Sequence, residues 1–147
     1  MKKRQQTIKR KTNETDVSLT LNIDGSGKRT IASGIPFFDH MLDLFSVHGL
    51  FDLDLKVKGD IEVDYHHSIE DIGICLGQAF HESIGSAKGI KRYASLLLPM
   101  DESLCQIAID VCNRPFLKFD CTYPANTVGS FDVELIEEFF KIGRAHV

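Results

Sequence analysis

The sequence has no apolar stretch close to the roughly 20 residues that a membrane-spanning helix needs. Its basic beginning is not followed by the apolar run of a signal peptide. It also lacks a C-x-x-C pair among its four cysteines, and the glycine spacing of nucleotide-binding loops. We therefore expect a cytoplasmic protein with reduced cysteines that makes no membrane or nucleotide contacts.

Positive charge is in the minority, with a net charge of −4 and an isoelectric point near 5.8. This balance argues against a general nucleic-acid-binding protein, which needs clustered positive charge to bind phosphate backbones. The basic residues that do cluster lie at the beginning of the chain: Lys2, Lys3, Arg4, Lys9, Arg10 and Lys11. An edge strand protected by charge is favoured over a phosphate-binding arm as their explanation.

The length of 147 residues and a hydrophobic content of 43% fit one globular domain. Alternation of apolar and polar residues predicts strands over residues 17–23, 29–32, 51–57, 103–112 and 116–121. In this interpretation the second strand is the hairpin partner of the first, and the fifth strand is the partner of the fourth. Helical spacing of apolar residues predicts helices over 36–49, 69–87 and from about 132 onward.

The two halves of the chain resemble each other. Glu14, two strands and Phe38 before a helix are echoed by Glu102, two strands and Phe131 before a helix. The first half continues into a further strand and helix, whereas the second half stops after its first helix. These features indicate an internally duplicated α+β fold, with helices packed against sheets and the second half incomplete.

The most distinctive local pattern is His66, His67 and Glu70 at the start of the long predicted helix. His66 and Glu70 share a helix face, whereas His67 points about 100° away. Imidazole and carboxylate ligands without thiolate suit manganese, iron, cobalt or zinc. The alternative is a pair of surface histidines at a helix end, because short motifs often match by chance.

Other candidates lie at element boundaries or on the preceding helix. His40 and His48 can face one flank of that helix, or can be structural histidines. Glu14 suits either a general base or an exposed carboxylate. Arg92 and Arg114 are placed either to bind a phosphate in bidentate fashion or to be solvated.

Six short segments, taken in order, identify a family that the chain resembles. They are RKTNET at 10–15, FDHML at 38–42, HGLFDL at 48–53, HHSIED at 66–71, PMDE at 99–102 and EEFF at 137–140. Together they resemble imidazoleglycerol-phosphate dehydratase. The resemblance implies dehydration of imidazoleglycerol phosphate to imidazole-acetol phosphate in histidine biosynthesis, with two manganese ions per complete site. It also implies a duplicated fold with helices between two four-stranded sheets.

The same resemblance assigns roles to individual residues. The manganese ligands that it implies are His40, His66, His67 and Glu70. Glu14 matches the acid/base glutamate of the family, and Glu70 is the second catalytic carboxylate. The substrate contacts that it implies are Glu14, these ligands, Asp43, His48 and, for the phosphate, Arg92 and Arg114.

The resemblance also predicts what this chain lacks. Family members continue for about fifty residues beyond Phe140 and assemble into 24-subunit particles. Residues 1–141 are therefore expected to be an incomplete domain, with halves that meet near residue 90, and to be inactive alone. Residues 142–147 resemble the translation of a sequencing adapter and are expected to be a non-native tail, so His146 is not counted as a ligand.

Two alternatives belong to other functional classes. A non-catalytic fragment or assembly subunit would keep half of a metal site, and metal stoichiometry together with turnover would distinguish it. A nucleic-acid-binding domain is the other, since related α+β topologies occur in ribosomal proteins. Binding that weakens steeply with salt would favour that second alternative.

Overall fold

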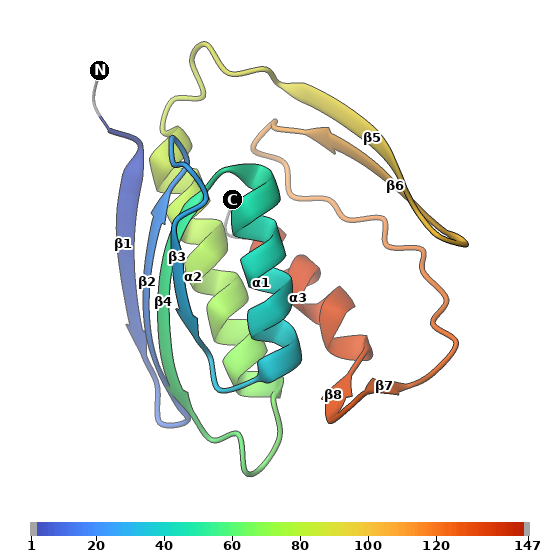
Figure 1. The fold of residues 1–147 in the computed structure, drawn as a ribbon. Coiled ribbons are helices and arrows are strands. Elements are labelled where there is room, and N and C mark those ends of the chain that lie inside the picture. The colour runs from blue at the N-terminus through green and yellow to red at the C-terminus, as the bar shows by residue number, and fades with distance from the viewer. Residues whose placement is uncertain (1–2, 146–147) are drawn as a thin grey trace.

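A four-stranded sheet covered by helices makes up the first part of the structure, and an exposed hairpin followed by one more helix makes up the second (Figure 1). The computed structural model describes residues 3–145. The first part contains β1 (Gln5–Lys11), β2 (Thr15–Asn22), β3 (Arg29–Ala32), α1 (Pro36–Gly49), β4 (Asp52–Gly59) and α2 (His66–Ile84). The second contains β5 (Tyr93–Met100), β6 (Ser103–Asp110), β7 (Thr127–Val128), β8 (Phe131–Asp132) and α3 (Glu134–Arg144). Within the described residues, no helix is long and apolar enough to cross a membrane.

The strand order of the first sheet is β1-β2-β4-β3. β1 lies at the sheet edge and contains Lys9, Arg10 and Lys11 of the basic segment, so the predicted edge strand is confirmed for these residues. Lys3 and Arg4 precede the strand, and Lys2 lies outside the described residues. The prediction that 29–32 is the hairpin partner of 17–23 was wrong, because β3 pairs in parallel with β4 instead. β4 is longer than β3 and sets three apolar pairs against β2, Val17 with Val57, Leu19 with Leu55 and Leu21 with Leu53. These pairs favour β4 as the neighbour of β2.

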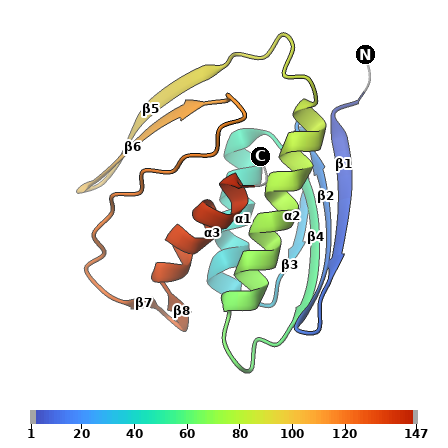
Figure 2. The ribbon, with the colours of Figure 1, turned by 180° about the vertical axis from the view of Figure 1, so that it is seen from behind.

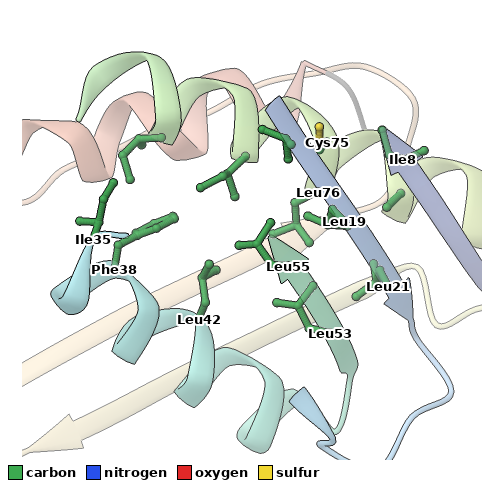
Figure 3. Close-up of a cluster of buried hydrophobic side chains, with 14 of the residues drawn as sticks. Ile8, Leu19, Leu21, Ile35, Phe38, Leu42, Leu53, Leu55, Cys75 and Leu76 are labelled. Carbon is green, nitrogen blue, oxygen red and sulfur yellow. The ribbon is translucent and has the colours of Figure 1, made fainter. Parts of the chain in front are cut away.

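The hydrophobic core lies between this sheet and helices α1 and α2. Leu19 and Leu55 of the sheet are fully buried, and Phe38 and Leu42 of α1 and Ile72 of α2 meet them there. Figure 3 shows the labelled side chains entering this space from both strands and helices. The predicted helices over 36–49 and 69–87 are confirmed as α1 and α2, because their apolar residues face the strands. The end of the second was placed too late, since α2 ends at Ile84 and Ala87 has a positive φ of 54°.

The β5–β6 hairpin stands apart from that core in both views (Figures 1 and 2). β5 and β6 pair along their whole length, yet every residue of both strands is exposed. The prediction that 116–121 is the partner of 103–112 was wrong, because β5 takes that place and 116–121 is irregular. The turn at Asp101 and Glu102 lets β5 pair with its nearest neighbour in sequence, at the lowest cost in loop closure.

Helix α3 begins close to the predicted position and packs against α2. A Cβ on Gly73 would lie 3.1 Å from the carbonyl oxygen of Phe139, so the two helix backbones approach closely there. The helix continues to Arg144, and Gly143 contacts Gly73. The assignment of residues 142–147 to a non-native tail stays a prediction, and His146 lies outside the described residues.

Two features of the second half echo the first. In both halves, a glutamate lies in the turn between the first two antiparallel strands: Glu14 between β1 and β2, and Glu102 between β5 and β6. A helix follows in each half, α1 in one and α3 in the other. The fold class is therefore α+β, consistent with duplicated halves of which the second has a smaller sheet.

Candidate functional site

The turn between β1 and β2 meets the start of α2 at one end of the sheet, and a pocket of about 120 Å³ lies between them. Its lining is almost entirely polar and consists of Arg10, Thr12, Glu14, His67, Glu70 and Asp71. Three of these residues, Glu14, His67 and Glu70, are candidates predicted from the sequence. Residues far apart in sequence thus meet in one small polar pocket, the usual place for acid–base chemistry.

The turn that carries Glu14 is held by hydrogen bonds of its own. The hydroxyl of Thr12 accepts the backbone N–H of Glu14 at 3.2 Å and that of Thr15 at 3.0 Å. The backbone N–H of Thr12 donates to the carbonyl of Thr15 at 2.9 Å, which closes the turn. Glu14 is exposed, so its side chain can reach a bound molecule.

The first turn of α2 presents two imidazoles in different directions. His66 Nε2 lies 3.9 Å from Glu70 Oε2, so the predicted shared face of this pair is confirmed. The rings of His66 and His67 are 6.1 Å apart and nearly perpendicular, with an interplanar angle of 85°. The backbone N–H of His66 donates to Asp64 Oδ1 at 2.8 Å, which satisfies one free donor of the helix terminus.

His67 has a carboxylate partner that the sequence analysis did not identify. Its Nδ1 lies 2.9 Å from Asp60 Oδ2, and this hydrogen bond raises the pKa of His67 above its ordinary value. Metal-binding histidines commonly have one ring nitrogen bonded to a carboxylate, which orients the other nitrogen toward the ion. Nε2 of His67 is the ring nitrogen left for a ligand. Within residues 3–145, however, no group of three or more His, Cys, Asp or Glu side chains is placed to hold an ion.

The candidates on α1 lie outside the pocket lining. His40 and His48 are exposed on the helix surface. Asp43 accepts two hydrogen bonds from Arg29, both at 2.8 Å, and this pairing lowers the pKa of the Asp43 carboxyl. The pair ties α1 to β3, which is a structural use of Asp43.

The two arginine candidates belong to the second half and also lie outside the pocket lining. Arg92 donates to Asp110 at 2.6 and 3.1 Å, and its guanidinium lies 4.9 Å from the ring centroid of Tyr93. Arg114 is exposed in the irregular segment after β6. Both guanidiniums are at the surface, where each could bind an anion.

Comparison with known proteins identifies the family. The sequence model of a family described as imidazoleglycerol-phosphate dehydratase matches residues 33–144. An imidazoleglycerol-phosphate dehydratase from Shouchella clausii is 56% identical over 133 residues, which cover 90% of this chain and 68% of that protein. One from Bacillus licheniformis is 57% identical over 130 residues, covering 88% of this chain and 67% of that protein. The chain belongs to the imidazoleglycerol-phosphate dehydratase family.

Solved structures of the imidazoleglycerol-phosphate dehydratase family share the fold. The Staphylococcus aureus enzyme matches with a TM-score of 0.85 and 34% identity, over 97% of this chain and 78% of that one. The Pyrococcus furiosus enzyme, solved in complex with (S)-C348, matches with a TM-score of 0.79 and 29% identity, over 95% of this chain and 73% of that one. The predicted family and α+β fold are thus confirmed, and membership of an enzyme family favours catalysis over the nucleic-acid-binding alternative.

The pocket lining contains two candidates that the sequence did not reveal, Arg10 and Asp71, and Asp60 is a third, bonded to His67 from outside the lining. Asp60 was interpreted only as part of a turn, and Arg10 only as part of the basic segment and of the RKTNET motif. Asp71 was quoted only as part of the HHSIED motif and given no role. A hint was available for Asp71, since a carboxylate next to Glu70 on a helix points about 100° away, toward the strands. No local pattern, however, could show which strand residues it contacts.

Proposed function

We propose that this chain forms part of the active site of a manganese-dependent imidazoleglycerol-phosphate dehydratase of histidine biosynthesis. The observation that carries the proposal is the pocket where Glu14 and Glu70 meet beside His67. Family membership supplies the reaction, and the pocket supplies carboxylates and imidazole for it. In this reaction a carbon-bound proton and the neighbouring hydroxyl leave as water, and the resulting enol rearranges to the ketone.

Proton removal is the difficult step for the residues of this chain. The departing proton is bound to carbon and is weakly acidic, so the base must be held close and well oriented. Glu14 suits this role because its carboxylate is exposed while its backbone is fixed in a hydrogen-bonded turn. Glu70 lines the same pocket from α2, where it can act on the substrate from another side.

His66, His67 and Glu70, joined by His40, would hold manganese. Their nitrogen and oxygen donors fit this ion, and the bond between Asp60 and His67 orients His67 as expected for a ligand. When bound, manganese supplies a Lewis acid that stabilises negative charge on the imidazole of the substrate. The α1 and α2 helices begin at the same end of the sheet, which places the start of the His40 helix on the side of the α2 histidines (Figure 1).

We propose that the remaining parts of the site come from residues outside the pocket lining. Arg92 and Arg114 would hold the substrate phosphate, and Asp43 and His48 would contact the substrate, in an assembly of 24 subunits. We also propose that the 147 residues alone are inactive, since the described residues gather no complete metal site. A reducing compartment such as the cytoplasm suits the free, exposed Cys105 and Cys121.

Turnover by a completed chain tests the proposal. The completed chain consists of residues 1–141 followed by the remaining C-terminal part of the Shouchella clausii relative, which is 56% identical over 133 residues. It should convert imidazoleglycerol phosphate, lose activity to a chelator and regain it with Mn²⁺. Glu14→Gln should lower kcat about 1000-fold, as expected for loss of a general base.

Asp16→Asn is the matched control, because Asp16 is a nearby exposed carboxylate whose partner is Lys11 at 3.3 Å. It should leave turnover unchanged. Full turnover by Glu14→Gln would contradict the proposed role of Glu14. Manganese-dependent turnover by the 147 residues alone would contradict the proposed inactivity.

A further inference from the structure

A buried carboxylate next to the pocket has no role in the function proposed so far. Asp71 is only 5% exposed and lies on the side of α2 that faces the sheet. Its Oδ1 accepts a 2.6 Å bond from Arg10 Nε on β1, and its Oδ2 accepts a bond from the hydroxyl of Thr15 on β2. One side chain thus joins two strands to a helix. Burying a carboxylate is costly unless its oxygens are paired, and here both oxygens of Asp71 accept a hydrogen bond.

The direction of the hydrogen bonds leads from Asp71 to Glu14. A carboxylate only accepts, so the single hydroxyl proton of Thr15 goes to Asp71. Thr15 Oγ1 lies 3.3 Å from Thr12 Oγ1, so the Thr12 proton goes to Thr15. The lone pairs of Thr12 then accept the backbone N–H groups of Glu14 and Thr15. Arg10, Thr12, Thr15 and Asp71 together form what we name the Asp71 clasp.

We propose that Asp71 is a positioning residue, which acts through the clasp to hold the Glu14 turn against the first turn of α2. The inference rests on the proposed function, since it assumes that Glu14 is the base. Glu70 and Asp71 are neighbours on α2, and the clasp therefore fixes Glu14 relative to the helix turn that carries Glu70 and His67. Within residues 3–145, the Glu14 side chain takes part in no hydrogen bond or ion pair, so it stays available for the substrate.

The opposite end of the same strands provides matched controls. Arg4, just before β1, pairs with Asp24, which follows β2, so an arginine–aspartate pair also exists far from the pocket. The hydroxyls of Thr7 and Thr20 are 2.8 Å apart across β1 and β2, and they are exposed. Thr20→Val therefore removes a cross-strand hydroxyl, as Thr15→Val does, without touching the clasp.

Kinetics of the completed chain test the inference. Thr15→Val is nearly isosteric and should lower kcat about 100-fold with little change in KM, because a displaced base affects the transition state more than binding. Thr15→Ser keeps the hydroxyl and should restore kcat to near the unsubstituted value. Thr20→Val should leave both constants unchanged. Asp71→Asn should resemble Thr15→Val if it folds.

A double substitution separates positioning from general stability. If the clasp acts through Glu14, Glu14→Gln with Thr15→Val should be no slower than Glu14→Gln alone. Multiplied losses in the double variant, or unchanged kcat in Thr15→Val, would overturn the inference. Full turnover by Glu14→Gln would overturn the proposed function first and the inference with it.

Hydrogen exchange in the 147-residue chain tests the Asp71 clasp without a measurement of enzyme activity. In Thr15→Val the amide protons at positions 14 and 15 should exchange faster, while those of α1 keep their protection. Unchanged exchange at Glu14 would overturn the clasp even if the proposed function holds.

Discussion

Two cross-strand pairs of similar composition have opposite environments in this protein. Leu19 pairs with Leu55 in the first sheet, and both side chains are 0% exposed. Leu96 pairs with Ile107 in the β5–β6 hairpin, where they are 54% and 44% exposed. Both pairs belong to antiparallel ladders. The difference therefore lies in what covers the strands.

Helices account for that difference. α1 and α2 lie against the first sheet and exclude water from it, whereas within residues 3–145 no helix lies against the hairpin to bury its apolar side chains. Apolar burial contributes to stability only where water is removed, so most of the stability should reside in the first part. The candidate site belongs to that stable part.

Phe131 joins the two regions, and its loss should have the largest effect. It is 2% exposed, and its ring lies 5.1 Å from Phe37 and 6.2 Å from Phe38. Phe131→Ala should lower the free energy of unfolding by about 4 kcal/mol, through lost burial and the cavity left behind. Urea unfolding measures this. A loss below about 1 kcal/mol would show that the contacts of Phe131 with Phe37 and Phe38 do not hold the two regions together.

Equivalent truncations of the two leucine pairs test the comparison itself. Leu19→Ala should destabilise by about 3 kcal/mol, since Leu19 is fully buried. Leu96→Ala should change the free energy of unfolding by less than about 0.5 kcal/mol, as at other surface positions. Denaturant unfolding of both variants provides the measurement. Equal losses would mean that the hairpin is as well packed as the sheet.

Asp52 offers a smaller, pH-dependent effect within the stable part. It accepts backbone N–H bonds from Ser26 at 2.8 Å and Lys28 at 3.0 Å, which lower its pKa from 3.8 to about 2. Its contribution is therefore present above pH 4 and is lost as pH falls toward 2. Asp52→Asn should cost roughly 1 kcal/mol at pH 7, allowing for solvent screening, and nothing near pH 2. Urea unfolding of both proteins between pH 2 and pH 7 measures this difference. A loss of stability in Asp52→Asn that does not change with pH would contradict the role given to the Asp52 carboxylate.

Proteolysis should distinguish the second part of the chain from the first sheet, and the substitution that tests this should have almost no effect on stability. Phe116 is 82% exposed in the irregular segment after β6. Brief chymotrypsin treatment should cut there before any site in the first sheet, because local opening at Phe116 costs little. Phe116→Ser should remove that first cut and leave the unfolding midpoint unchanged. A first cut within β2 or β4 would reverse the proposed order of stability.

The sequence predicted elements well and their partners less well. The spacing of Phe38 and Leu42 locates α1 because helical periodicity is local. β5 was missed because its apolar run at Leu96, Leu97 and Leu98 does not alternate. The position of β4 between β2 and β3 depends on long-range pairing, which no local pattern contains.

In the candidate site, too, local spacing could be predicted and long-range contacts could not. His66 and Glu70 are on one helix turn, so their spacing alone predicted a shared face. The bond between Arg10 and Asp71 joins residues 61 positions apart, and it became visible only once the strands and α2 were packed. The shared helix face of His66 and Glu70 could be predicted from their spacing, whereas the contacts that orient the site could not, and the chemistry of the motifs stays a prediction.

The position of bound manganese tests the central claim most directly. Crystals of the completed chain soaked in Mn²⁺ should give an anomalous diffraction peak beside His67 Nε2 and Glu70, with the Glu14 carboxylate facing it across the pocket. Manganese bound only elsewhere, with His67 and Glu70 free of metal, would contradict the claim that the start of α2 and the Glu14 turn form one catalytic centre.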